Sequence, residues 1–146
     1  MSKSNTFEND LLKHIFNNDA IALIGDATGV RGSTTAGSLY VSLHTADPGE
    51  AGDQTTNETA YTNYVRVAVA RTSGGWTVSA NAVSNTALVQ FAQCGASGAT
   101  LTHFGVGTDS ASTGKLLYSG ALTSSLAVSS GIQPQFAAGD LDITED

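Results

Sequence analysis

The stretch Leu39-Tyr-Val-Ser-Leu-His-Thr-Ala-Asp-Pro-Gly49 decides the fold class of this chain. Apolar and polar side chains alternate from Leu39 to His44, which is typical of a β-strand with one buried face. The strand must end at Asp47-Pro48-Gly49, because proline presets φ and glycine tolerates a positive φ, so the chain turns there. We therefore expect a half-buried strand followed by a sharp turn.

Short segments of this kind recur along the chain, separated by turns rich in Gly, Ser, Ala and Asp. No segment repeats another in sequence, which argues against a propeller or a solenoid. The pattern predicts a mainly β protein, an antiparallel β-sandwich or jelly roll of about eight short strands with one N-terminal amphipathic helix. The expected strands are 39–45, 64–71, 76–79, 86–91, 100–106, 115–121, 125–128 and a closing segment that ends at Ile143.

Residues 5–18 have the pattern of an amphipathic helix. Asn5 is placed to cap its start, and Glu8 follows at the capping-box position. The segment 25–38 consists mostly of small residues and predicts a loop or an extended arm. We therefore divide the chain into an N-terminal helix and arm, residues 1–38, and a β-sandwich domain, residues 39–146. The apolar stripe of the helix consists of Phe7, Leu11, Leu12, Ile15 and Phe16.

The composition argues against several function classes. The chain has 146 residues, enough for one domain with its own core. Its net charge is −7 with only six lysines and arginines, so it lacks a basic surface for direct binding of nucleic acid. It has neither an apolar run of about 18 residues that would cross a membrane nor an apolar secretory segment at its start. We expect it to act where it is made or in the particle that carries it away.

Strand alternation also predicts which residues form the core. The valines of the segment 64–71 should face inward, with Arg66 on the opposite face. The single cysteine, Cys94, excludes an intramolecular disulfide and a cysteine metal site, and free cysteines are usually buried. The expected core strand residues are Leu39, Val41, Leu43, Val65, Val67, Val69, Val89, Phe91, Phe104, Val106 and Leu117.

Residues with catalytic potential do not form a recognisable pattern. His44 and His103 lie in expected strands, but no Gly-x-Ser-x-Gly turn accompanies them and no histidine pair has zinc-binding spacing. The segment 107–115 is not a phosphate-binding loop, because Asp109 stands where that loop needs glycine and Leu116 follows the lysine. We predict no catalytic, cofactor-binding or metal-binding residues.

Two groups of residues leave alternatives open. The loop 47–58 carries four carboxylates, which indicate a solvated acidic loop or, as the alternative, a site for calcium or a basic partner surface. Tyr61, Tyr64 and Trp76 stand at strand boundaries and favour packing, with a carbohydrate platform as the alternative. The four carboxylates are those of Asp47, Glu50, Asp53 and Glu58.

Several separate blocks carry a family resemblance: Leu39 to Gly49, Tyr64-Val-Arg-Val-Ala-Val69, Trp76-Thr-Val78, Thr102-His-Phe-Gly105, Leu116-Leu-Tyr-Ser-Gly-Ala-Leu122 and Phe136-Ala-Ala-Gly-Asp-Leu-Asp-Ile143. In this order they resemble small tailed-bacteriophage virion proteins, which are labelled tail-fibre or structural proteins. The resemblance spans nearly the whole chain. It implies a virion component, assembled in the host cytoplasm, that associates with other virion proteins.

The sequence itself bears on the place of such a protein in the virion. Long trimeric fibres need sequence repeats or coiled-coil heptads, and the chain has neither. A compact β domain with a helix and an arm favours a capsid decoration protein that clamps coat subunits. We expect the major capsid protein as its partner, together with homo-oligomer formation. The expected contact residues are those of the stripe, Phe7, Leu11, Leu12, Ile15 and Phe16, unless the helix packs on its own sandwich.

Two other functions compete with capsid decoration. The first is a tail-associated, tail-fibre or baseplate protein that attaches to the host surface, which a low copy number per particle would indicate. The second is a carbohydrate-binding or hydrolytic domain that uses Trp76, His44 and His103, which glycan binding or hydrolysis would reveal. Because no catalytic spacing supports hydrolysis, we expect a non-enzymatic protein.

Overall fold

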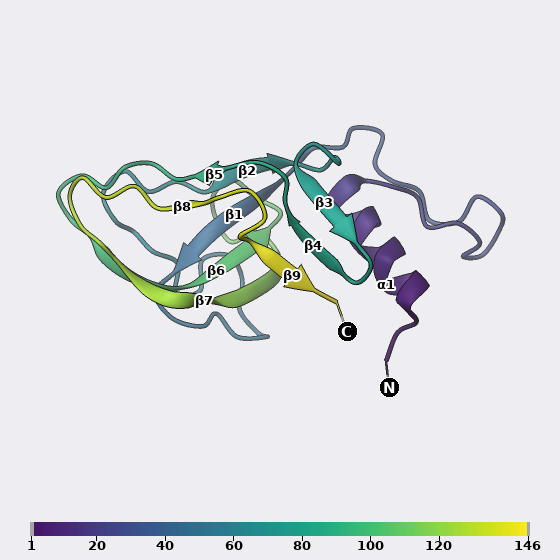
Figure 1. Cartoon of the computed structure of the whole chain (residues 1–146), viewed down its shortest axis with the longest axis horizontal. Helices are drawn as coiled ribbons and strands as arrows, with labels where there is room; N and C mark the ends of the chain where they lie inside the picture. The colour runs from purple at the N-terminus through teal and green to yellow at the C-terminus, as the bar shows by residue number, and fades with distance from the viewer. Residues whose placement is uncertain (1, 146) are drawn as a thin grey trace. The chain divides into compact units, whose positions relative to one another are not determined.

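The structure is a computed structural model, and it describes residues 2–145. One helix begins the chain and nine strands follow within these residues, paired in antiparallel sheets (Figure 1). This confirms the predicted mainly β class with one N-terminal helix, although nine strands are present instead of about eight. In sequence order the elements are α1 (Asn5–Leu12), the π-helical turn η1 (Lys13–Asn17), β1 (Ser38–His44), β2 (Val67–Ala70), β3 (Trp76–Ser79), β4 (Ala82–Asn85), β5 (Val89–Gln90), β6 (Ala99–Gly107), β7 (Leu116–Val128), β8 (Gln135–Phe136) and β9 (Asp142–Thr144).

The chain forms two compact units, each built from separate stretches of sequence. Unit 1 comprises residues 1–38, 69–88 and 136–146, and unit 2 comprises residues 39–68 and 89–135. The N-terminal segment therefore shares a unit with β3, β4 and β9. The predicted division into residues 1–38 and 39–146 stays a prediction.

Unit 1 packs the helix against a small sheet of order β3-β4-β9, beside which α1 lies in Figure 1. Leu12 and Phe16 are fully buried, and the Phe16 ring meets the buried Trp76 ring edge-on at 4.8 Å between centroids. Ser4, rather than Asn5, caps the helix: its extended backbone lets its Oγ accept from the Phe7 amide at 3.3 Å. The helix thus starts as expected, with its cap one residue earlier.

Two polar side chains, the half-buried Arg71 and the buried Asn85, fix the irregular parts of unit 1. Arg71 donates to the carbonyls of His14 and Ile15, both at 2.7 Å, so it satisfies backbone oxygens near the end of the helical segment. Asn85 donates to the carbonyl of Ala137 at 2.7 Å and accepts from the amide of Leu141 at 2.9 Å. These bonds hold the 137–141 segment, which has little regular structure, against the sheet.

Unit 2 contains most of a sheet of order β2-β1-β6-β7. Strands β1 and β6 pair antiparallel, with Val41 opposite Val106 and Leu43 opposite Phe104, so these apolar side chains share one face. The predicted burial is confirmed for seven strand residues and also for Cys94. The seven are Leu39, Val41, Leu43, Val89, Phe91, Phe104 and Val106.

The predicted inward face of the segment 64–71 is wrong at Val65 and Arg66, whereas Val67 and Val69 lie on the more buried face of β2. Val65 is 61% exposed, whereas Arg66 is buried. Strand β2 begins only at Val67, because the chain turns at Asn63 with φ of 79°, so the alternation does not run through residues 64–66. Val67, Val69 and Leu117 are half-buried and do not belong to the fully buried core.

Strand boundaries differ from the prediction in two further places. The expected strand 86–91 is reduced to the short β5, and β4 forms just before it. The expected strands 115–121 and 125–128 are a single strand, β7, which pairs with β6 across a register shift between Leu101 and His103. A β-bulge of this kind lets a long strand remain paired while it bends.

Candidate functional site

The polar side chains of unit 2 gather on the face of the sheet opposite to its apolar core. The pairing places Ser42 opposite Gly105 and His44 opposite His103, and it continues to Ser119, which lies opposite Gly105 on β7. Because side chains alternate along a strand, these residues share one face. The loop 45–58, which follows β1, covers part of this face through the contacts described next.

Ser42 and His44 form a fully buried hydrogen-bonded pair. Nδ1 of His44 lies 2.9 Å from the carbonyl oxygen of Thr56, which only accepts, so we assign the proton to Nδ1. Nε2 then accepts from Oγ of Ser42 at 2.8 Å. Burial lowers the pKa of His44 from its ordinary value, so the ring stays neutral. Both residues are 0% exposed, so no substrate reaches the serine, and the pair instead ties the loop to the strand.

A buried ion pair anchors the same loop. The guanidinium of Arg66 binds both oxygens of Glu58 at 2.7 Å and donates to the carbonyls of Asp109 and Ser112 at 2.9 and 2.8 Å. The hydroxyl of Tyr64 donates to Glu58 at 2.8 Å. The hydrogen bonds with Glu58 raise the pKa of Arg66, and burial raises the pKa of Tyr64. Arg66 therefore links the end of the acidic loop to the loop 108–114.

Gln54 makes a second link between the two loops. Its amide oxygen accepts from the Asp109 amide at 2.9 Å, and its amide nitrogen donates to the Asp109 carbonyl at 3.2 Å. Gly107 and Gly114 make room for the Gln54 side chain, because a Cβ on either glycine would lie 2.2 or 2.1 Å from it. The side chains of Arg66 and Gln54 thus fix the two loops to each other.

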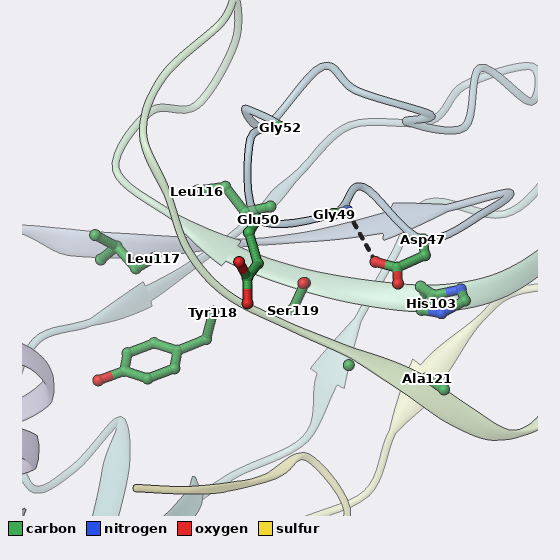
Figure 2. A pocket seen from close by; sticks show the side chains of 11 residues that line it. Asp47, Gly49, Glu50, Gly52, His103, Leu116, Leu117, Tyr118, Ser119 and Ala121 are labelled. Atoms are coloured by element: carbon green, nitrogen blue, oxygen red, sulfur yellow. Dashed lines mark hydrogen bonds between the residues drawn. The ribbon is translucent and has the colours of Figure 1, made fainter. Parts of the chain in front are cut away.

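An open groove lies beside this network. Its volume is about 470 Å³, and it lies between the loop 47–52 and the strands β6 and β7. Figure 2 shows Asp47 and Glu50 reaching from the loop toward the strand that carries Ser119, whereas the Tyr118 ring points away from Asp47. The lining residues are Asp47, Gly49, Glu50, Gly52, His103, Leu116, Leu117, Tyr118, Ser119, Gly120 and Ala121.

The residues proposed from sequence for other sites lie elsewhere. Trp76 and His44 are fully buried, and Tyr61 is 2% exposed with its hydroxyl bonded to the carbonyl of Ala92, so they do not form a carbohydrate platform. Burial raises the pKa of Tyr61 to about 12, which keeps it protonated. Of the residues that the sequence offered for a carbohydrate site, His103 lies in the groove.

The four carboxylates of the acidic loop do not converge on one point. Asp47 accepts from the amide of Gly49 at 2.9 Å, and Glu58 is held by Arg66. Asp53 accepts from the hydroxyl and the amide of Thr55, and these bonds lower the pKa of Asp53. No group of three or more metal-binding side chains occurs in residues 2–145, so the calcium alternative has no support from this geometry.

The predicted interface stripe divides into two parts. Leu12 and Phe16 belong to the core of unit 1, as the alternative in which the helix packs on its own chain requires. Phe7 is 38% exposed, and Leu11 and Ile15 are half-buried. The role of this stripe in contacts with a partner stays a prediction. Neither described helical segment is long and apolar enough to span a membrane.

Two features of this region could not be predicted from the sequence. Arg66 was expected to face solvent, and only a three-dimensional contact with Glu58 explains its burial. The groove is lined by the loop 47–52 and by residues of β6 and β7, which are far apart in sequence. They come together in space through the pairing of β6 with β7 and the fold of the loop.

The chain was compared with known proteins. A family model described as Podophage GP4 fiber I protein gp80 matches residues 2–144, nearly the whole chain. No curated protein matches it. The matched range contains the helix, all of unit 2, nearly all of unit 1 and every residue of the groove.

Proposed function

Because the chain belongs to the podophage GP4 fiber I protein gp80 family, we propose that it is a non-enzymatic structural component of a phage fibre. The membership confirms the resemblance to phage virion proteins and makes the chain a virion component. The match over residues 2–144 is the observation that carries the proposal. The lack of sequence repeats favoured capsid decoration, but the description of the matching family as a fiber protein favours the tail-fibre role.

The packing of unit 2 supports a mechanical rather than a catalytic role. The Ser-His pair is sealed from solvent, and a Cβ at Gly105 would already lie 2.6 Å from Ser42 Oγ and 2.7 Å from His44 Nε2. There is no room for a substrate at this serine. The pair, the Arg66–Glu58 contact and Gln54 instead hold two loops in place, which suits a protein that must keep its shape on a particle.

Attachment to the rest of the virion is assigned to the helix and arm of unit 1. In the arm, taken here from residue 20 because the helical segment ends at Asn17, Leu23 is 81% exposed and adopts φ of 67°. This left-handed conformation costs a leucine roughly 1–2 kcal/mol. Ile24 and Val30 are also exposed, as is Phe7 on the helix. Covering an exposed leucine removes apolar surface from water, and a strained backbone conformation is typical of a site with a function. We therefore assign the arm to contacts with a neighbouring virion protein.

Two measurements test this proposal. The first is the position and copy number of the chain on the particle, by cryo-electron microscopy with a labelled chain. A low copy number at the tail is expected, whereas hundreds of copies over the head would identify a capsid decoration protein and overturn the fibre role.

The second measurement is incorporation of the double variant Phe7→Ser/Leu23→Ser into particles. Incorporation should fall strongly while the melting temperature of the isolated chain stays within a few degrees of the parent, because both side chains are exposed. Val65→Ser is the matched control, since Val65 is 61% exposed but lies in unit 2. Equal incorporation of the double variant and the control would refute the assignment of the arm and helix.

A further inference from the structure

The loop 45–58 leaves the sheet at His44 and returns to the same residue. The carbonyl of Thr56 accepts from Nδ1 of His44 at 2.9 Å, and Glu58 forms an antiparallel bridge with His44. We propose that His44 is an acid-sensitive latch: when its ring becomes protonated on both nitrogens, the loop 45–58 opens while β1 and β6 stay paired. The latch is a property of the isolated chain, so it goes beyond the fibre role and does not depend on it.

The neutral ring fits this site, and a ring with two N–H groups does not. In the neutral ring, Nδ1 donates to Thr56 and Nε2 accepts from the hydroxyl of Ser42 at 2.8 Å. A proton on Nε2 would place two donors face to face, so the Ser42 hydroxyl would have to turn and accept. Its own hydrogen would then need another acceptor, which water does not supply because Ser42 is fully buried.

The loop is the part of this surrounding that can move. A Cβ at Gly105, opposite Ser42 on β6, would lie 2.7 Å from His44 Nε2, so the backbone of β6 closely approaches the ring. The pairing of β1 with β6 runs without interruption from Tyr40 to His44, which holds this side in place. Opening of the loop is therefore the smaller change that brings water to a charged ring.

The charges around His44 oppose protonation of the ring. Glu58 from the returning loop attracts a positive charge, whereas Arg66 from the segment before β2 and His103 from β6 repel it. Glu58 binds the guanidinium of Arg66 with both oxygens at 2.7 Å, so its charge is already compensated. The Tyr64 hydroxyl, which donates to Glu58, stays neutral because burial raises its pKa. Burial, the largest influence on the ring, lowers the pKa of His44 from its ordinary value.

The other carboxylates of the loop are directed elsewhere. Asp47 accepts from the amide of Gly49, and Asp53 accepts from the hydroxyl and the amide of Thr55. Glu50 reaches toward the strand that carries Ser119 (Figure 2). Carboxyl groups ordinarily titrate below pH 5 and histidines between pH 5 and pH 8, so the window from pH 7 to pH 5 tests the histidines.

The latch controls one wall of the groove. Asp47 and Glu50 line the groove from the loop 47–52, so this wall moves away from β6 and β7 when the loop opens. Gln54 and Arg66 also hold the loop, through Asp109 and Glu58. Neither of these two side chains changes its charge between pH 7 and pH 5, so acid acts on the contact at His44.

Hydrogen exchange of the full chain, followed by NMR at pH 7 and pH 5, measures this opening as protection factors. The Thr45 amide donates to the carbonyl of Asn57 at 2.8 Å and the Gln54 amide to that of Thr113 at 3.0 Å, so both amides report on the loop. The closed form binds fewer protons than the open form, so a fall in pH favours opening. With an ordinary histidine pKa of about 6.5 in the open form, the protection of both amides should fall by about 10- to 25-fold.

The Phe91 amide is the internal control, because it donates to the carbonyl of Pro134 at 3.0 Å in the same unit but outside the loop. Phe91 should be more protected than Thr45 and Gln54 at both pH values. Equal protection of all three amides at both pH values would show that the loop opens only when the whole chain unfolds. That result would overturn the latch, and so would protection of the loop amides that is the same at pH 7 and pH 5.

Two variants assign the effect to one ring. His44→Gln should give the loop amides the same protection at pH 7 and pH 5. His103→Gln is the matched control, since His103 lies opposite His44 on β6, and it should keep most of the fall in protection. A fall that persists in His44→Gln, or one that is lost in His103→Gln, would refute the assignment to His44.

The imidazole ¹⁵N chemical shifts of the parent chain give a test that does not require either variant to fold. At pH 7 they should show Nδ1 of His44 protonated and Nε2 unprotonated, in agreement with the hydrogen bonds to Thr56 and Ser42. The titration of His44 should follow the loss of protection in the loop. A ring that is doubly protonated at pH 7, or a loop that opens at a pH where His44 does not titrate, would overturn the proposal.

Discussion

Removing the carboxylate of Glu58 should lower the free energy of unfolding by about 3–5 kcal/mol, because it leaves the guanidinium of Arg66 buried without a counter-charge. The Arg66 side chain is 3% exposed and that of Glu58 is 15% exposed, so the guanidinium is largely withdrawn from water. Arg66 would keep its bonds to the carbonyls of Asp109 and Ser112, which are neutral acceptors. The Tyr64 hydroxyl also loses its acceptor, at a further cost of about 1 kcal/mol.

The chain offers a matched control for this substitution. Glu145 pairs with Lys3 at 3.2 Å, and its side chain is 16% exposed, which is close to the value for Glu58. Its cation differs, because the Lys3 side chain is 29% exposed and stays hydrated. Glu145→Ala should therefore cost only about 0–1 kcal/mol. The difference in unfolding free energy between Glu58→Ala and Glu145→Ala therefore measures the effect of burying the cation.

Urea unfolding followed by circular dichroism at neutral pH measures both variants, with the urea slope checked for a change in the unfolding transition. The double variant Glu58→Ala/Arg66→Met should regain part of the stability lost by Glu58→Ala, because it removes the unpaired charge. The reasoning is refuted if Glu58→Ala costs no more than Glu145→Ala, or if the double variant is less stable than Glu58→Ala.

Three further predictions address the network and the helix. Because burial lowers the pKa of His44, the unfolded chain binds more protons than the folded chain, so the free energy of unfolding should fall as the pH drops below about 6.5. His44→Gln should flatten this dependence, as measured by urea unfolding at pH 7 and 5. Gly105→Ala should lower the free energy of unfolding by roughly 1–3 kcal/mol, because the added Cβ would collide with Ser42 and His44. Gly74→Ala, whose Cβ would make only an ordinary contact, should lower it by less than about 1 kcal/mol. Similar losses for both variants would contradict the packing argument. Leu12→Ala should lose about 2–5 kcal/mol because Leu12 is fully buried, and Phe7→Ala should change stability little; the opposite order in thermal unfolding would place the helix differently.

The parts of the fold that local sequence could predict are those where one pattern governs one element. The alternation of residues 39–44 correctly predicted the buried apolar face of β1, although Ser42 and His44 on its other face are buried as well. Within the stripe of residues 5–16, Leu12 and Phe16 are fully buried. Cys94 followed the general habit of free cysteines and is buried. These predictions needed no knowledge of what lies across the sheet.

Other features depended on contacts between distant segments. The alternation predicted that Val65 faces inward and Arg66 faces outward, but Arg66 is buried because Glu58 and the loop 108–114 bind it. The sequence predicted two strands, 115–121 and 125–128, but they form the single strand β7, because β6 pairs with β7 on both sides of the register shift. The groove could not be read from the sequence for the same reason, since its two walls meet only after β1, β6 and β7 have paired.

The contact of Gln54 with two glycines restricts the order in which this region can change during evolution. A side chain at Gly107 or Gly114 collides with Gln54, and Gly114 also adopts φ of 49°. Shortening Gln54 first would make space, yet it would remove both of its hydrogen bonds to Asp109 and so weaken the attachment of the loop 108–114. The three positions are therefore epistatic: each single step is unfavourable even where a combination would be tolerated. New surface chemistry in this part of the protein is more accessible through loop residues such as Ala111, which lies between the two glycines and is exposed.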